Sequence, residues 1–338
     1  MLPLLLKYGL NVDFALRPAI FDGNYAQVQI LLENGADINA IGRFNNTPLH
    51  EAVSGGLENI VKLLLDHGAD INAIGNFNNP PLHEAVSGGH EAIVKLFLDH
   101  GAGINANGNF NDTPLHEAVS GGLEHIVKLL LDHGADINAQ NMRSQTPLHK
   151  AASGGHEAIA KLLLENGADI NAQNMRSQTP LHKAASGGHE AIAKLLLENG
   201  ADINAQNIRS KTPLHDAASG GHEAIVKLFL DHGADIKTQG GMALWLAAVE
   251  GNEGCEDIVK LLLDHGADVN KECFGGAPLI KAVSKGCEDI VKLLLDHGAD
   301  VNRGNWNGTP LQQAASCNHE VIWRLLFNYG ANVNTTSG

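Results

Sequence analysis

The chain repeats itself with a period of 33 residues, and one stretch does so without a single change. Residues 142–174 recur letter for letter as residues 175–207. A protein with one packed core has no need of such copies, whereas a unit that stacks on copies of itself meets the same neighbour on each side. The period therefore predicts a stacked repeat architecture, and the positions that differ between units are where specificity can reside.

Each unit carries the same signals for two short helices. Pro can begin a helix because the N–H that it lacks would be unpaired in the first turn, and a preceding Thr can cap that helix. A Ser-Gly-Gly turn follows, then Glu-x-x-(Val/Ala)-Lys-Leu-(Leu/Phe)-Leu, and Gly-Ala-Asp-Ile-Asn closes most units. The opening Thr-Pro-Leu-His, or Pro-Pro-Leu-His in one unit, stands at 47–50, 80–83, 113–116, 146–149, 179–182 and 212–215.

The unit that follows residue 46 illustrates the expected structure. We expect a short first helix, a second helix over 58–65, and Gly68 in the left-handed conformation that ends a helix. Residues 70–79 are rich in Asn and Gly and predict an extended, hairpin-like arm. The side chains expected to face inward are Leu49, Ala52, Val53, Ile60, Val61, Leu63 and Leu64.

This pattern resembles the ankyrin repeat, whose period and Thr-Pro-Leu-His-x-Ala signature match nearly the whole chain. The resemblance implies a mainly α-helical ankyrin-repeat solenoid, built from helix-turn-helix pairs with projecting β-hairpin-like loops. It also implies that the signature histidine hydrogen-bonds to backbone of the neighbouring unit.

The repeats divide the chain into a partial unit over residues 1–13 and ten repeats over residues 14–338. The unit at 242 departs most from the pattern, since its preceding arm is short and residues 250–254 look like an insertion. We expect a seam in the superhelix at 237–255. The ten repeats begin near residues 14, 47, 80, 113, 146, 179, 212, 242, 277 and 309.

Composition limits the partners and the location. The net charge is −15, which argues against nucleic acid or an anionic membrane as the main partner. No apolar run is long enough to span a bilayer, and the apolar start is too short for a signal peptide. We expect a monomeric protein of the cytoplasm or another intracellular location, including a host cytosol. Its thiols are expected to be reduced, at Cys255, Cys273, Cys287 and Cys317.

The histidines do not point to catalysis or to a metal. Almost all of the 18 fall into columns that recur from unit to unit, and a recurring column has a recurring structural role. A metal needs ligands that converge on one point, whereas stacked units separate such side chains by about 8–10 Å. We therefore predict no catalytic residue, no cofactor and no metal, and a protein that is not an enzyme.

Two variable columns carry the candidate binding residues. In ankyrin-repeat proteins, the partner usually meets the concave side formed by the arm tips and the first helices. The tip column reads Phe44, Phe77, Phe110, Arg143, Arg176, Arg209, Phe274 and Trp306. The helix column reads Glu51, Glu84, Glu117, Lys150, Lys183 and Asp216. An exposed row of Phe is more explicable if a partner covers it, and aromatic residues and Arg are common at interfaces.

The sequence therefore predicts a protein–protein interaction module or scaffold that binds a partner protein along its concave surface. An alternative is the targeting or substrate-recognition arm of a larger protein, such as a ligase adaptor, a channel or a host-directed effector. Another is a substrate of an asparaginyl hydroxylase, at Asn72, Asn105, Asn138 and their equivalents. Recent duplication could also have produced the Phe and Arg blocks, and a tip Phe could fold against its neighbour's arm.

Overall fold

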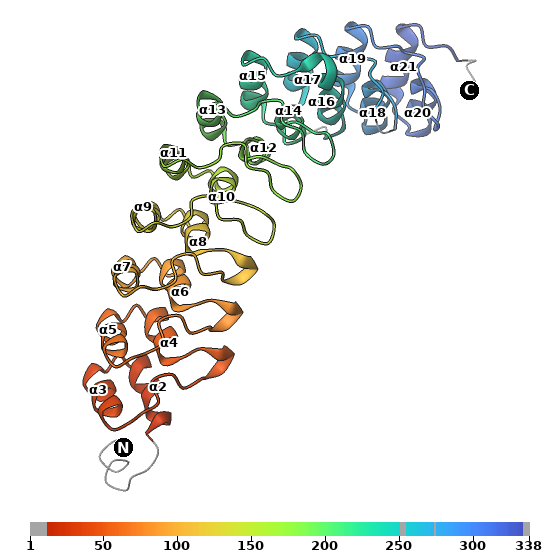
Figure 1. Ribbon diagram of the computed structural model, residues 1–338. Coiled ribbons are helices and arrows are strands. Elements are labelled where there is room, and N and C mark those ends of the chain that lie inside the picture. Colours follow the sequence, from red (N-terminus) through yellow and green to blue (C-terminus); the bar gives the residue numbers. More distant parts are fainter. Residues whose placement is uncertain (1–11, 251–254, 274, 334–338) are drawn as a thin grey trace. The chain divides into compact units, whose positions relative to one another are not determined.

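The computed structural model describes residues 12–250, 255–273 and 275–333. The chain forms two compact units, residues 1–169 (unit 1) and residues 170–338 (unit 2). Within each unit, helices come in antiparallel pairs that stack on the next pair, as Figure 1 shows. We call the first helices of the pairs the first-helix row, and the second helices the second-helix row. No described helix combines the length and apolar character needed to cross a bilayer.

The described residues of unit 1 form five helix pairs. Its first-helix row consists of α2 (Asp13–Phe21), α4 (Pro48–Ser54), α6 (Pro81–Ser87), α8 (Pro114–Ser120) and α10 (Pro147–Gly154). Its second-helix row consists of α3 (Tyr25–Glu33), α5 (Glu58–Asp66), α7 (Glu91–Asp99), α9 (Glu124–Asp132) and α11 (Glu157–Glu165). Three arms end in short 3-10 turns: η1 (Arg43–Asn45), η2 (Asn76–Asn78) and η3 (Asn109–Asn111).

Unit 2 repeats this arrangement. Its first-helix row consists of α12 (Pro180–Gly187), α14 (Pro213–Ser219), α16 (Ile236–Glu250), α18 (Pro278–Lys285) and α20 (Pro310–Ser316). Its second-helix row consists of α13 (Glu190–Glu198), α15 (Glu223–Asp231), α17 (Cys255–Asp264), α19 (Glu288–Asp296) and α21 (Glu320–Asn328).

The apolar core lies between the two rows of each unit, as the sequence predicts. The seven inward residues expected in the repeat that begins near residue 47, from Leu49 to Leu64, are all buried. Gly68 has a φ of +88° and ends its helix in the left-handed conformation. The arms are loops closed by single bonds such as Gly75 N–H to Asn79 O (3.0 Å), and the described residues contain isolated β-bridges but no strand.

In several repeats that carry the Thr-Pro-Leu-His signature, a Thr–His bridge links the first helix to the next arm. At His116, the amide and hydroxyl of Thr113 lie 3.2 and 2.9 Å from Nδ1. Because Nδ1 accepts the amide, the ring carries its proton on Nε2, which donates to Gln145 O at 2.8 Å, 29 residues ahead. This confirms the inter-repeat role expected for the signature histidine. The same Nε2 bond is made by His50 to Asn79 O, His83 to Asp112 O and His182 to Lys211 O.

Where the signature lacks His, other side chains take its place. Arg17 stands at the histidine position of the first full unit and donates to Asn46 O at 2.7 Å, again 29 residues ahead. Gln312 occupies the position near the C-terminus, and its Oε1 accepts the Thr309 N–H at 2.9 Å. The position therefore selects for a donor or acceptor that can serve the backbone, and the imidazole is one solution among several.

The repeat at 242 differs from the others more than the sequence indicates. The residues expected to form a shortened arm lie instead in α16, one continuous helix of 15 residues. Residues 251–254, which hold most of the expected insertion, lie outside the described residues. The seam at 237–255 and the repeat boundaries therefore remain predictions.

One Thr–His bridge is incomplete, and restoring it should stabilise the protein. Pro80 replaces Thr, and Nδ1 of His83 is buried without a hydrogen-bond partner. Pro80→Thr would supply the amide and the hydroxyl that Nδ1 lacks. Each hydrogen bond contributes about 0.5–1.5 kcal/mol, and loss of the proline's rigidity offsets about 0.4–1 kcal/mol. We expect a net gain of about 1 kcal/mol in the free energy of unfolding, measured by urea denaturation.

Thr113→Pro is the matched control, because it copies the Pro80 arrangement onto the neighbouring repeat. It should lower the free energy of unfolding by a similar amount. If Pro80→Thr unfolds at the same urea concentration as the wild type, the unpaired Nδ1 atom carries no energetic penalty and the bridge is not a source of stability.

Candidate functional site

The tips of three arms in unit 1 present phenylalanines to solvent. Phe44, Phe77 and Phe110 are 74%, 69% and 61% exposed, so they do not fold against the neighbouring arms. Their φ angles are 57°, 52° and 55°, in the left-handed region that costs a residue with a Cβ about 1–2 kcal/mol. An exposed aromatic side chain on strained backbone contributes little to folding, which is the pattern expected where a site, rather than the fold, requires the residue.

The arms that carry these tips are held in register by their asparagines. Asn46 Oδ1 accepts the Asn76 N–H at 2.8 Å, and Asn79 Oδ1 accepts the Asn109 N–H at 2.7 Å. The Phe110 carbonyl in turn accepts an N–H from the next arm at 2.9 Å. The backbone at the three tips is therefore held in register, and the arms lie in a row beside the first helices (Figure 1).

The glutamates expected on the first helices lie in the same unit and differ in their partners. Glu51 forms an ion pair with Arg17. Glu84 accepts a hydrogen bond from Ser54 at 3.1 Å, and Glu117 accepts one from Ser87 at 2.8 Å. Both are partly buried, and neither forms an ion pair within the described part of the chain. We call the surface formed by Phe44, Phe77, Phe110, Glu51, Glu84 and Glu117 the Phe–Glu face.

Burial changes the titration of the two carboxyls that lack a cation. Burial raises the pKa of Glu84 to about 6, although the Ser54 hydroxyl acts in the opposite direction. Burial raises the pKa of Glu117 to about 7, and the nearby Asp112 carboxylate adds to this while Ser87 and Lys150 lower it. At neutral pH, Glu117 is therefore shared between its charged and neutral forms.

The arginine tips are exposed, but the basic helix expected beside them is partly occupied. Arg143 in unit 1, and Arg176 and Arg209 in unit 2, form no ion pair among the described residues. Lys150, however, forms an ion pair with Asp112 at 3.0 Å, and Lys183 donates to a glutamine at 2.8 Å. Exposed apolar side chains adjoin these arginines, namely Met142, Met175 and Ile208.

The remaining candidates belong to unit 2 or lie outside the description. Trp306 is 83% exposed. Asp216 is partly buried, and burial raises its pKa to about 6. Phe274 lies outside the described residues. Eight of the candidates therefore lie in unit 1, and five lie in unit 2: Arg176, Arg209, Lys183, Asp216 and, on a later arm, Trp306.

Sequence reasoning missed two side chains that shape this surface. Arg17 neutralises Glu51, and Asp112 neutralises Lys150. The signal for each lies in the sequence: Arg17 replaces the signature His, and Asp112 is the acidic member of a column that reads Asn46 and Asn79 in the preceding units.

The asparagines expected as hydroxylation sites have a structural role between repeats. The Oδ1 atoms of Asn72, Asn105 and Asn138 accept backbone N–H groups of Gly103, Asp136 and Asp169 at 2.8–2.9 Å. These bonds join the start of one arm to the next.

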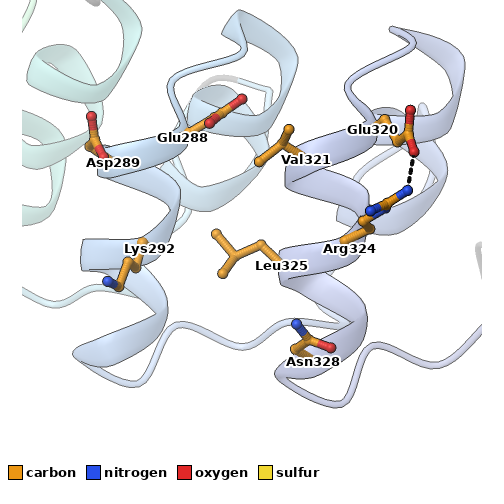
Figure 2. A pocket seen from close by; sticks show the side chains of 8 residues that line it. All are labelled: Glu288, Asp289, Lys292, Glu320, Val321, Arg324, Leu325 and Asn328. Atoms are coloured by element: carbon orange, nitrogen blue, oxygen red, sulfur yellow. Dashed lines mark hydrogen bonds and ion pairs between the residues drawn. The ribbon is translucent and has the colours of Figure 1, made fainter.

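A shallow groove of about 620 Å³ lies between α19 and α21 in unit 2. Val321 and Leu325 line it from α21, opposite Asp289 and Lys292 of α19, as Figure 2 shows. The groove is open and lies in the second-helix row, away from the arm tips. Within the described residues, no three His, Cys, Asp or Glu side chains are grouped as metal ligands would be.

The repeat geometry agrees with a sequence comparison. The family model described as ankyrin repeats (3 copies) matches residues 1–74, 73–141, 140–207, 206–273 and 254–337. The chain belongs to the ankyrin-repeat family. Ankyrin repeats form a scaffold for protein interaction, and this chain is therefore a protein-interaction module.

Among solved structures, the chain is similar to the ankyrin repeat domain of Bcl-3, which is described as a unique member of the IkappaB protein family. The two chains share 31% identity, with a TM-score of 0.55 over 59% of this chain and 91% of that one. A search among curated proteins finds no match.

The strain at the phenylalanine tips should be measurable. Phe77→Gly places the residue that tolerates a positive φ at that position, and we expect the free energy of unfolding to rise by about 0.5–1 kcal/mol in urea denaturation. Phe77→Ala is the control, since it removes the ring but keeps a Cβ on the left-handed backbone. If the Gly variant is no more stable than the Ala variant, the tips store no backbone strain.

The signature histidines should make stability fall in mild acid. Burial lowers the pKa of His182 below that of the unfolded chain, despite its bond to Lys211 O. The unfolded state then binds more protons, so stability declines as pH falls below about 6.5. His182→Gln keeps a cap of the kind that Gln312 makes, without a titrating ring. We expect the urea midpoint of the wild type to fall more between pH 7.5 and 5.5 than that of the variant.

The carboxyl groups whose pKa values are raised in the folded protein have the opposite effect on stability. The folded state binds their protons more readily than the unfolded state, so they increase the free energy of unfolding as pH falls toward 4.5. Glu84 and Glu117 in unit 1 and Asp216 in unit 2 are common to both proteins, so their effect cancels in the comparison. Parallel pH profiles for the wild type and His182→Gln would show that the ring is not held neutral by the fold.

Proposed function

We propose that the chain binds a partner protein through its arm tips and first helices, with the Phe–Glu face of unit 1 as the principal contact. The observation that carries this proposal is the row of three phenylalanines that are exposed on strained, well-anchored backbone. Stacked helices stand about 8–10 Å apart, so the three rings span about 20 Å. An extended segment of six or seven residues has that length, at about 3.3 Å per residue.

The other exposed tips extend the proposed contact within their own units. Arg143 adjoins the Phe–Glu face in unit 1, and Arg176, Arg209 and Trp306 offer contacts in unit 2. Three further candidates lie on the first helices rather than on the arms: Lys150, Lys183 and Asp216. We propose that they set the local charge beside the arginines. The same surfaces would serve a scaffold and the recognition arm of a larger protein alike.

Removing the three rings should weaken this binding strongly while leaving the fold intact. We expect Phe44→Ala, Phe77→Ala and Phe110→Ala together to weaken the affinity for a purified partner by about a hundredfold or more, because interface anchors contribute about 1–2 kcal/mol or more each. The partner is first captured from native cells with the wild-type chain, identified by mass spectrometry and then titrated by calorimetry.

Val321→Ala with Phe327→Ala is the control, because these side chains are 57% and 53% exposed but belong to α21. That variant should bind like the wild type. Binding that survives the triple substitution would place the contact on another face and contradict the proposal.

A further inference from the structure

The Phe–Glu face contains an internal example of a carboxylate whose cation is already in place. Arg17 donates to Ala40 O and Asn46 O at 2.7 Å each and forms an ion pair with Glu51. The guanidinium thus joins the carboxylate of a first helix to the backbone of the preceding arm. This arrangement shows what a glutamate at this position of the repeat can bind.

The next two repeats offer the same carboxylate without the cation. Glu84 and Glu117 stand at the position of Glu51, one and two repeats further along. The side chain that would correspond to Arg17 is a signature histidine there, and His50 and His83 use Nε2 for the arm carbonyl. Their burial lowers the pKa of both rings, so they remain neutral and supply no positive charge.

Among the described residues of unit 1, no other cation forms an ion pair with these carboxylates. Lys150 is the cation whose charge lowers the pKa of Glu117, yet its ammonium group forms an ion pair with Asp112 at 3.0 Å. The remaining groups that influence Glu117 are Ser87, Asp112 and Glu84, of which two are acidic. The partner of Glu84 is the Ser54 hydroxyl, which donates a hydrogen bond to it and lowers its pKa. A partly buried carboxylate with a single hydroxyl donor gains more from an added cation than an exposed one does.

The spacing of the two carboxylates fixes a register. Adjacent first helices stand about 8–10 Å apart. An extended chain in the polyproline II conformation advances about 3.1 Å per residue with three residues per turn, so basic side chains three residues apart point to the same side, about 9 Å apart, and would meet successive glutamates. The residues between them can place apolar side chains against the Phe tips, and the net charge of −15 favours approach of a cationic chain.

From this juxtaposition we propose that the Phe–Glu face binds an extended, cationic peptide segment, with one Lys or Arg on Glu84 and another, three residues away, on Glu117. The inference rests on the proposed function and specifies the partner's chemistry. Glu51 needs no cation from the peptide, because Arg17 already neutralises its charge.

The test uses defined peptides and the full chain. A fluorescein-labelled peptide of four Lys-Leu-Ser triplets is titrated by anisotropy at 0.15 M salt, beside a peptide of the same composition with its four lysines grouped at one end. We expect the spaced peptide to bind more tightly. Glu84→Gln with Glu117→Gln keeps both serine bonds and should weaken it about fivefold to tenfold, since each ion pair contributes up to about 1 kcal/mol.

Glu91→Gln with Glu124→Gln is the matched control, because it removes the same charge from exposed positions in the second-helix row of the same two repeats. It should change the affinity less than twofold. Equal weakening by both double variants would show general attraction to an acidic chain and overturn the inference, as would equal binding of the two peptides or no binding of either.

The pH dependence supplies a second readout. The pKa values of about 6 and about 7 mean that Glu84 and Glu117 take up protons between pH 8 and 5.5, while the peptide's lysines stay charged. Affinity should therefore fall over this range for the wild type and change little for Glu84→Gln with Glu117→Gln. A pH profile that is the same for both proteins would contradict the proposed contacts.

These results separate the inference from the proposed function. If the native partner needs the three Phe rings but is unaffected by Glu84→Gln with Glu117→Gln, the binding face stands and the cationic register fails. If the partner is unaffected by loss of the rings, the proposed function fails as well.

Discussion

The Thr–His–carbonyl bridge is the interaction on which the rest of the structure depends. One imidazole closes the N-terminus of a first helix through Nδ1 and holds the following arm through Nε2. Because the Nε2 bond reaches 29 residues ahead, each helix start is coupled to the placement of the next tip. Burial keeps the ring neutral, so a single tautomer serves both ends of the bridge. The capping of a first helix and the stacking of the next repeat therefore depend on the same side chain.

This coupling explains how the arms tolerate strained residues. A positive φ at Phe77 or Phe110 costs energy that a free loop would release by rearranging. The arm that carries Phe110 cannot do so, because His83 holds the Asp112 carbonyl and the Asn79 side chain of the preceding arm accepts the Asn109 N–H. The scaffold thus separates two tasks: buried polar bridges set the backbone, and the tip side chain is left to contact something else. Strain at the tip is a consequence of that separation.

The sequence predicts the regular parts of the fold well because they depend on neighbours of fixed spacing. The helix positions, the inward residues from Leu49 to Leu64 and the left-handed Gly68 all follow from local pattern and period. The fate of charges does not follow, because it depends on pairs from different columns. Lys150 meets Asp112 across 38 residues, and Arg17 meets Glu51 across 34. Reading each column separately assigns Lys150 to a basic surface and Glu51 to an acidic one, whereas both are paired. The sequence likewise does not predict that α16 replaces an arm, because a shortened arm does not indicate which structure its residues adopt.

The pattern of change among the internal copies bears on whether duplication alone explains the tips. The arms of unit 1 read Arg-Phe-Asn, Asn-Phe-Asn and Asn-Phe-Asn, and they are followed by Asn-Thr, Asn-Pro and Asp-Thr. One copy has therefore lost the threonine of its bridge and leaves a buried histidine nitrogen unpaired. The same copy keeps Phe77, although the exposed ring adds nothing to the buried core. A tip ring that persists in a repeat with a weakened bridge supports the proposal that a partner, rather than the fold, requires the ring.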